Sequence, residues 1–189
     1  MSHREGILRT ALTLFNHKGV GVTTTNHIAA EAGVSPGNLY FHFRDKGEIL
    51  AVLFAEMVAD LREVWRFALP PVGLSEPAEF LGATSDVSWR FRFFHREMYA
   101  LRRHDSALAK AWRQHVRESI AAFDTALTEW SERGLIPAFA SADERREVVG
   151  QTIVMLSHFL QFHEAAERIA SRENVRDGVA MVVRSLHRR

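Results

Sequence analysis

The sequence contains no cysteine, which excludes disulfide bonds, cysteine-ligated metal sites and thiol catalysis. It has no run of about eighteen consecutive apolar residues, which a membrane-spanning helix requires, and its first ten residues, MSHREGILRT, are too polar for a secretory signal. An excess of charge of one sign is absent too, because 24 basic residues nearly balance 23 acidic ones. We therefore expect a cytoplasmic protein with no membrane partner.

The signatures of several enzyme classes are also missing. No Glu-x-x-His pair, Gly-rich Walker loop or Gly-x-Ser-x-Gly elbow occurs. His158 and His163 are five residues apart, which places them about 140° apart around a helix rather than on one metal-binding face. We expect a protein that is not an enzyme and needs no metal or cofactor. A helical small-molecule-binding enzyme stays open as an alternative, because scattered Ser, His and acidic residues do not exclude a triad.

What the sequence does contain is a succession of helix signals. Apolar residues recur with helical spacing along residues 7–15, and Gly19 follows as a stop. Thr24 or Thr25 can cap a second, short helix, which ends at Gly33. Small residues on that helix permit close packing. The pattern predicts one longer helix followed by a short one.

A third helix is predicted to start directly afterwards. Ser35 is a strong N-cap residue, and Pro36 stands at the first helical position, where its missing N–H costs nothing. Asp45 and Glu48 have capping-box spacing and start a fourth helix. Two short helices joined by a tight Gly-containing turn, braced by a longer one, form a helix-turn-helix, whose last helix enters the major groove of DNA.

The start of the third predicted helix is the candidate DNA reader. Pro36, Gly37 and Tyr40 share its outer face, and Asn38 lies beside them. Gly37 lets base edges approach closely, the Asn38 amide can bond a base edge or a phosphate, and the Tyr40 hydroxyl can reach a phosphate. Lys46, in the first turn of the next helix, is expected to share a phosphate with the helix amides. A solvated lysine is the alternative.

The rest of the chain has the same character. Helical periodicity predicts a long fourth helix that is stopped by Pro70 and Pro71, and strand signals are nearly absent. Ser141 and Glu144 form another capping box. The remaining apolar stripes predict one long or kinked helix followed by three more, over residues 78–101, 105–130, 142–162 and 175–186. The predicted fold is all-α, with about nine helices.

Residues 4 to about 50 resemble the DNA-binding region of the TetR (tetracycline repressor) family of bacterial transcription regulators. The similarity lies in ILRTALTLFNHKGV, TTTNHIAAEAGVS and GNLYFHFRDKGEIL, and in the pattern formed by Leu39, Tyr40, His42, Phe43 and Lys46. It implies a helix-turn-helix domain over residues 1–47 and a helical ligand-binding and dimerisation domain over residues 48–189. It also implies a homodimer that pairs through the last two helices.

Site residues follow from the same resemblance. It implies contacts with the DNA backbone from Thr24 or Thr25, Tyr40, His42 and Lys46. It implies base contacts from the region of Pro36, Gly37 and Asn38, with Ser35 acting as cap, contact or both. The partner is then a near-palindromic double-stranded DNA operator. An architectural DNA-binding protein without an effector is the other alternative, but it would not need so large a second domain.

The second domain also contains aromatic residues that are candidates for an effector cavity, since ligand pockets are mostly apolar. Plain core packing is the competing interpretation for each of them. They are Trp65, Trp89, Phe93, Phe94, Trp112, Phe123 and Phe159. The sequence thus predicts a ligand-responsive transcriptional repressor, released from its operator by an unknown, largely apolar small molecule.

Overall fold

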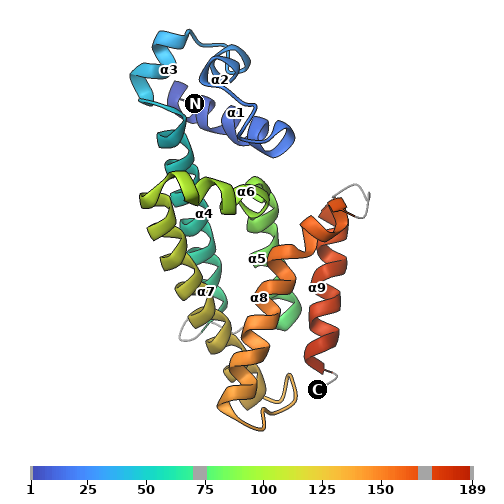
Figure 1. Ribbon diagram of the computed structural model, residues 1–189. Coiled ribbons are helices and arrows are strands. Elements are labelled where there is room, and N and C mark those ends of the chain that lie inside the picture. Colours follow the sequence, from blue (N-terminus) through green and yellow to red (C-terminus); the bar gives the residue numbers. More distant parts are fainter. Residues whose placement is uncertain (1, 70–75, 166–171, 188–189) are drawn as a thin grey trace.

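The computed structural model describes residues 2–69, 76–165 and 172–187, and within these ranges all regular secondary structure is helical. Figure 1 shows the arrangement. The helices are α1 His3–Lys18, α2 Thr25–Glu31, α3 Pro36–His42, α4 Lys46–Ala68, α5 Pro77–Arg90, α6 Arg92–His104, α7 Ser106–Glu132, α8 Ala142–Ala165 and α9 Arg172–His187. The predicted all-α fold is confirmed. The predicted stop at Pro70 and Pro71 lies outside the described residues.

The predicted cap residues begin and end the helices where the sequence placed them. Thr24, Ser35 and Asp45 each accept a hydrogen bond from the backbone N–H three residues ahead, at 3.2, 3.1 and 2.9 Å. Ser141 does the same at the start of α8, at 3.1 Å. Gly19, with φ 88°, ends α1 in a conformation that disfavours a side chain. These local signals therefore set the helix boundaries around the helix-turn-helix.

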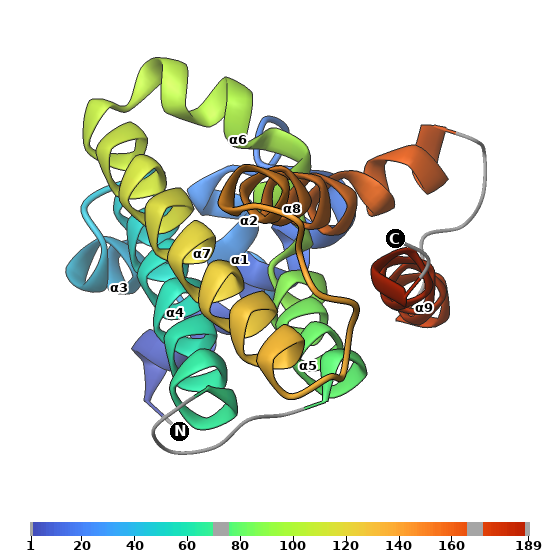
Figure 2. The ribbon, with the colours of Figure 1, turned by 90° about the horizontal axis from the view of Figure 1, so that it is seen from below.

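Helices α1 to α3 gather at one end of α4, as Figure 1 shows. α4 contains 23 residues and is therefore about 35 Å long. Helices α5 to α9 pack on α4 or on one another. α5 and α7 both pack on α4, α8 packs on α7, and α9 packs on both α5 and α8 (Figure 2). A single helix thus runs from the helix-turn-helix into the larger part of the molecule.

The segment that the sequence predicted as one long or kinked helix is two helices, α5 and α6, separated at Phe91. Phe91 has φ −110° and ψ 32°, which ends α5, and its side chain is fully buried. The backbone groups freed on either side bond to the side chain of Asn16 in α1. The break is therefore stabilised by a distant helix, and neither proline nor glycine marks it in the sequence.

The buried apolar side chains form one continuous core that joins the helix-turn-helix to the larger bundle. Phe15 of α1 lies 5.2 Å from Phe93 of α6, measured between ring centroids, and Phe54 of α4 lies 5.3 Å from Phe94. Over the residues that the structure describes, no helix combines the length and apolar character needed to cross a bilayer.

Candidate functional site

The turn between α2 and α3 is tight and internally bonded. Gly33 adopts φ 67°, and its N–H donates to the carbonyl of Ala30 at 3.2 Å. The N–H of Val34 donates to the carbonyl of Ala29 at 3.0 Å. These bonds satisfy carbonyls at the end of α2 and turn the chain directly into the N-cap of α3. The two short helices and their turn thus form the helix-turn-helix that the sequence predicted.

α3 is held from one side only. Leu39 and Phe43 are buried, whereas Ser35, Pro36 and Gly37 are exposed. A side chain built at residue 37 would have open space, since its nearest neighbour would be the Ser35 hydroxyl at 3.9 Å. The start of α3 therefore presents a surface with little side-chain bulk, which a groove floor can approach closely.

Tyr40 links the two short helices at this surface. Its hydroxyl lies 2.9 Å from the hydroxyl of Thr25 at the start of α2. Tyr40 is half exposed, and Thr24 beside the pair is exposed. The structure thus brings three predicted backbone-contact residues together at the N-terminus of α2, where amide groups favour an anion.

Lys46 has a role in the fold that the sequence did not reveal. Its ammonium group donates to the backbone carbonyls of Val20 and Thr23, at 2.7 and 2.9 Å. These carbonyls belong to the loop that leads into α2. Lys46 therefore joins the start of α4 to this loop, and two of its three N–H donors are used within the chain.

The remaining predicted residues of the reader are less open. Asn38 and His42 are both half-buried. The amide oxygen of Asn38 is enclosed. Phe41 is 83% exposed and lies edge-to-face on His42 at 5.1 Å, so it adds an apolar surface that sequence reasoning did not single out. The sequence signal for this surface was an apolar residue on the otherwise polar side of a short helix.

A polar junction fastens α1 to α6. The guanidinium of Arg96 donates to the carbonyls of Phe15 and Asn16, at 3.1 and 2.7 Å. The carboxylate of Glu97 accepts from the backbone N–H of Val20 at 3.0 and 3.1 Å. Hydrogen bonds between charged side chains and backbone groups are stronger than those between neutral groups. The helix-turn-helix is therefore tied to the larger bundle at α6 as well as through α4.

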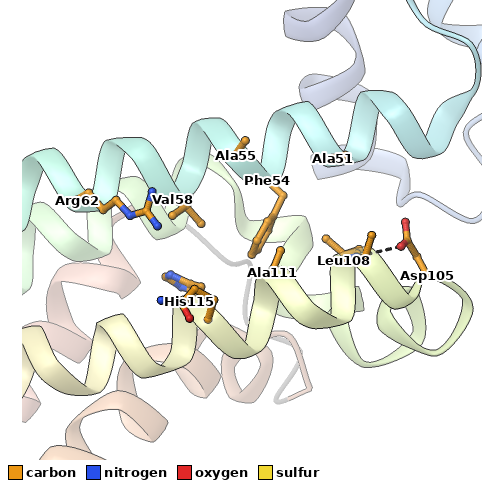
Figure 3. Close-up of a pocket in the computed structure, with 11 residues that line it drawn as sticks. Ala51, Phe54, Ala55, Val58, Arg62, Asp105, Leu108, Ala111 and His115 are labelled. Atoms are coloured by element: carbon orange, nitrogen blue, oxygen red, sulfur yellow. Dashed lines mark hydrogen bonds between the residues drawn. The ribbon is translucent and has the colours of Figure 1, made fainter.

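The larger bundle contains a groove between α4 and α7, which Figure 3 shows in close-up. The groove has a volume of about 360 Å³. Its lining is mainly apolar, with His115 and Arg62 among its few polar side chains. Arg62 is not free to meet a ligand charge, because its Nε and Nη2 donate to the carboxylate of Glu118 at 2.9 and 2.8 Å.

A smaller chamber, of about 40 Å³, lies on the other side of His115. Trp65, Thr84 and His115 line it. Burial lowers the pKa of His115 to about 4, and burial together with the neighbouring His115 and His158 lowers the pKa of His95, also in the lining, to about 4. Both imidazoles are therefore uncharged at neutral pH.

The aromatic residues predicted to line a cavity separate into two groups. Trp65 and Phe123 line the chamber, and Trp112 lines a further cavity of about 320 Å³ that shares His95 with it. The other four line none of these three cavities; they are Trp89, Phe93, Phe94 and Phe159. Trp89 stacks with Arg92, Phe93 packs on Phe94, and the ring of Phe159 lies against the backbone at Gly178. Their role toward a ligand stays a prediction.

Sequence reasoning did not single out the polar residues of the chamber. Thr84 and Ser88 are four residues apart on α5, and His115 and Ser119 are four residues apart on α7. Each pair lies on one helix face within an otherwise apolar stripe. The sequence signal for the chamber was the repeat of polar residues four positions apart on a buried helix face.

Comparison with known proteins matches both parts of the chain. Residues 7–53 match the family model for bacterial regulatory proteins of the tetR family, and residues 57–187 match a model for a bacterial transcriptional repressor. A solved TetR-family transcriptional regulator from Marinobacter aquaeolei is 29% identical, with a TM-score of 0.88 over 99% of this chain and 90% of that one. The family models together cover most of the sequence.

Curated relatives match over short segments of the chain. The regulator AcrR of Shigella flexneri is 36% identical over 61 residues, 32% of this chain and 28% of that protein. The repressor BepR of Brucella suis is 48% identical over 46 residues, 24% and 22% of the two chains. The matched segment thus spans about a quarter of these relatives' length. The fold is shared by AibR, solved with isovaleryl coenzyme A and operator DNA, at 19% identity, TM-score 0.67 and coverage of 95% and 97%.

Proposed function

The chain belongs to the TetR family of bacterial transcription regulators, and on this premise we propose that it is a ligand-responsive repressor of a near-palindromic operator. The observation that carries the proposal is the coexistence of two features in one molecule. One is a helix-turn-helix whose third helix has an open, small-residue face. The other is a group of cavities in a bundle that shares α4 with that helix-turn-helix.

We assign residues 1–47 to DNA binding, with α3 in the major groove. Ser35, Pro36, Gly37 and Asn38 lie at the start of α3, which supports contacts with base edges there. We assign the backbone contacts to Thr24 and Thr25 at the start of α2, to Tyr40 and His42 of α3, and to Lys46 at the start of α4. Phosphate contacts of this kind hold the reader in register, and base contacts give sequence preference.

We assign residues 48–189 to effector binding and to a homodimer through α8 and α9. Val154 of α8 and Met181 of α9 are apolar side chains with 57% and 40% exposure, which a second copy packed on these helices would cover. Dimerisation through one patch on each copy relates the two α3 helices by a two-fold axis. Their separation then matches half-sites about 34 Å apart, or a multiple of one helical turn.

Release from DNA follows as a shift between two states of the same dimer. An effector that fits the bundle better when α4 is displaced favours the state in which the α3 helices are misplaced for the operator, by no more than its preference between the states. α4 and the junction through Arg96 and Glu97 of α6 are two of the mechanical links between the bundle and the helix-turn-helix.

The alternatives are less well supported. An architectural DNA-binding protein needs no cavity, whereas this bundle contains cavities of about 360 and 320 Å³, in the range that small molecules occupy. A helical enzyme would need reactive groups aligned in a pocket, and the titratable groups that line the chamber within the described residues are two neutral histidines. We therefore propose that the chain is not an enzyme and that it requires no cofactor.

The test is selection of bound duplexes from a random pool by the purified protein, followed by the salt dependence of binding to the enriched sequences. We expect an inverted repeat, bound as a dimer. Gly37→Glu adds a negative charge where the structure has room for it, so it should abolish enrichment without unfolding the protein. Ser106→Glu adds the same charge at the exposed start of α7 and should change nothing. Failure of the unaltered protein to enrich any repeat would overturn the proposal.

A further inference from the structure

Three residues that line the chamber each carry a buried polar group without a partner among the described residues. They are the indole N–H of Trp65, the hydroxyl of Thr84 and Nδ1 of His115. Each of the three residues is only 7% exposed. Burying a polar group without a hydrogen bond costs free energy, so such groups are rare in folded proteins. Three residues with such groups in the lining of one small space point to a molecule that completes their bonds.

The chemistry of that molecule follows from the donors and acceptors present. The indole N–H of Trp65 can only donate, and the Thr84 hydroxyl can do both. The hydroxyls of Ser88 and Ser119 already donate to backbone carbonyls, at 3.1 and 2.9 Å, so their oxygens remain available as acceptors. The chamber therefore suits a group that accepts from Trp65 and can also donate, as a hydroxyl does.

Among the residues that the structure describes, no fully charged side chain lines the chamber. Arg62 and Glu118, which flank His115, neutralise each other through two hydrogen bonds. His95 and His115 are neutral because burial holds the pKa of each at about 4. A carboxylate or an ammonium group would lose its hydration here and gain no opposite charge. An uncharged polar group pays no such penalty.

The size of the two spaces indicates how such a molecule lies. The chamber, at about 40 Å³, admits a small polar group but not a whole ligand. The groove between α4 and α7, at about 360 Å³, is large enough for an apolar body and has a mainly apolar lining (Figure 3). His115 lines both spaces, so it lies where the groove and the chamber adjoin.

We propose that the effector is an uncharged amphipathic molecule whose hydroxyl or similar neutral group enters the chamber and bonds Trp65, Thr84 and His115, while its apolar part lies in the α4–α7 groove. This inference rests on the proposed function, since it names the class of its effector. Because α4 and α7 form the groove walls and α4 carries the helix-turn-helix, occupation of the site acts on the element that positions α3.

Three probes that share one apolar body test the head group: 4-ethylphenol, ethylbenzene and 4-ethylbenzoate. The readouts are the thermal midpoint of the purified dimer, the fluorescence of its tryptophans and binding to the selected operator. We expect 4-ethylphenol to raise the midpoint and weaken operator binding, ethylbenzene to bind at least tenfold more weakly, and 4-ethylbenzoate not to bind. Preference for the benzoate, equal binding of ethylbenzene, or no effect of the phenol up to its solubility limit would overturn the inference.

Thr84→Val separates a ligand contact from a structural role. If the hydroxyl awaits a ligand, its removal should leave the thermal midpoint of the free protein unchanged or raised, and should weaken 4-ethylphenol about tenfold without affecting ethylbenzene. If water alone occupies the chamber and bonds the hydroxyl, the midpoint falls and phenol affinity does not change, which overturns the inference. Thr125→Val is the control, because that exposed hydroxyl on α7 bonds only its own helix, at the carbonyl of Ala121.

The two proposals fail in different ways. Operator selection uses no probe, so a protein that binds an inverted repeat but ignores 4-ethylphenol remains a repressor with a different effector class. If the protein binds 4-ethylphenol through Thr84 but selects no operator, the ligand site in the chamber is supported and the proposed repressor function is not.

Discussion

The side chain of Asn16 in α1 accepts a hydrogen bond from the backbone N–H of Phe93 in α6, at 3.2 Å. The same side chain donates through Nδ2 to the carbonyl of Arg90, the last residue of α5, at 2.9 Å. One buried amide thus satisfies the two backbone groups that the break between α5 and α6 leaves open. It couples the geometry of that break to the helix that braces the helix-turn-helix.

Asn16→Leu should destabilise the protein, because both backbone groups would stay buried without a partner. We expect a loss of about 2–4 kcal/mol in the free energy of unfolding, measured by urea denaturation. Thr13→Ala, on the exposed side of the same helix, is the control and should cost far less, since its hydroxyl bonds only the carbonyl of Arg9. An Asn16→Leu protein as stable as the control would show that the break does not depend on this amide.

This contact also marks the limit of what the sequence predicted about the fold. Cap residues such as Ser35 and Asp45 act through bonds three residues away, so local pattern was enough to place the helices around them. The break at Phe91 is fixed by a residue more than seventy positions earlier. Because that signal is not local, periodicity alone joined α5 and α6 into one helix.

Tyr40→Phe should weaken operator binding several-fold for all operator sequences alike, since the hydroxyl is proposed to contact a phosphate and not a base. The free energy of unfolding should change by less than about 1 kcal/mol, because Tyr40 is half exposed and loses only its bond to Thr25. Thr25→Val removes the other half of that pair. Combining the two changes in a double-mutant cycle on operator affinity separates the pair from each hydroxyl's own contact with DNA.

Lys46→Met should have two effects. Loss of the bonds to the carbonyls of Val20 and Thr23 should reduce the free energy of unfolding by roughly 1–3 kcal/mol. Loss of a phosphate contact should also lower the slope of log affinity against log salt by about 0.9. If stability falls but the salt slope does not change, Lys46 only holds the loop before α2 and does not contact DNA.

Lys46 and His115 show why the sequence predicted the sites only in part. The position of Lys46 at a helix start suggested an anion, but the carbonyls that it bonds come from a loop over twenty residues away. His115 sits among apolar residues of α7, and its enclosure by Phe54, Trp65 and Trp112 appears only when the helices pack. Tertiary neighbours, not residue type, decide what each group can bind.

The stability of the protein should fall between pH 6.5 and about pH 4. Burial lowers the pKa values of His95 and His115 to about 4, so below pH 6.5 the unfolded chain takes up protons that the folded chain refuses. From pH 7 to pH 5 each histidine should cost roughly 1–2 kcal/mol. His115→Gln should reduce that slope in denaturation curves, and the exposed control His104→Gln should not. Equal slopes in both variants would mean that His115 titrates normally.

Gly178 of α9 faces the ring of Phe159 of α8 so closely that a Cβ at this position would lie 2.7 Å from the ring. Gly178→Ala must therefore push the ring aside or separate the two helices, and we expect it to destabilise the protein by about 1–3 kcal/mol. Gly150→Ala in α8 is the matched control. Its Cβ would meet nothing within 4 Å, so the gain in helix propensity should stabilise the protein by about 0.5–1 kcal/mol.

Because α8 and α9 are also the proposed dimer helices, the two glycine variants should differ in assembly as well as in stability. A displaced Phe159 ring changes the angle between α8 and α9, and a two-fold interface repeats that change on both copies. Sedimentation equilibrium should then show a weaker dimer for Gly178→Ala and an unchanged one for Gly150→Ala. A Gly178→Ala protein that loses stability and keeps its dimer affinity would place the dimer contacts on other helices.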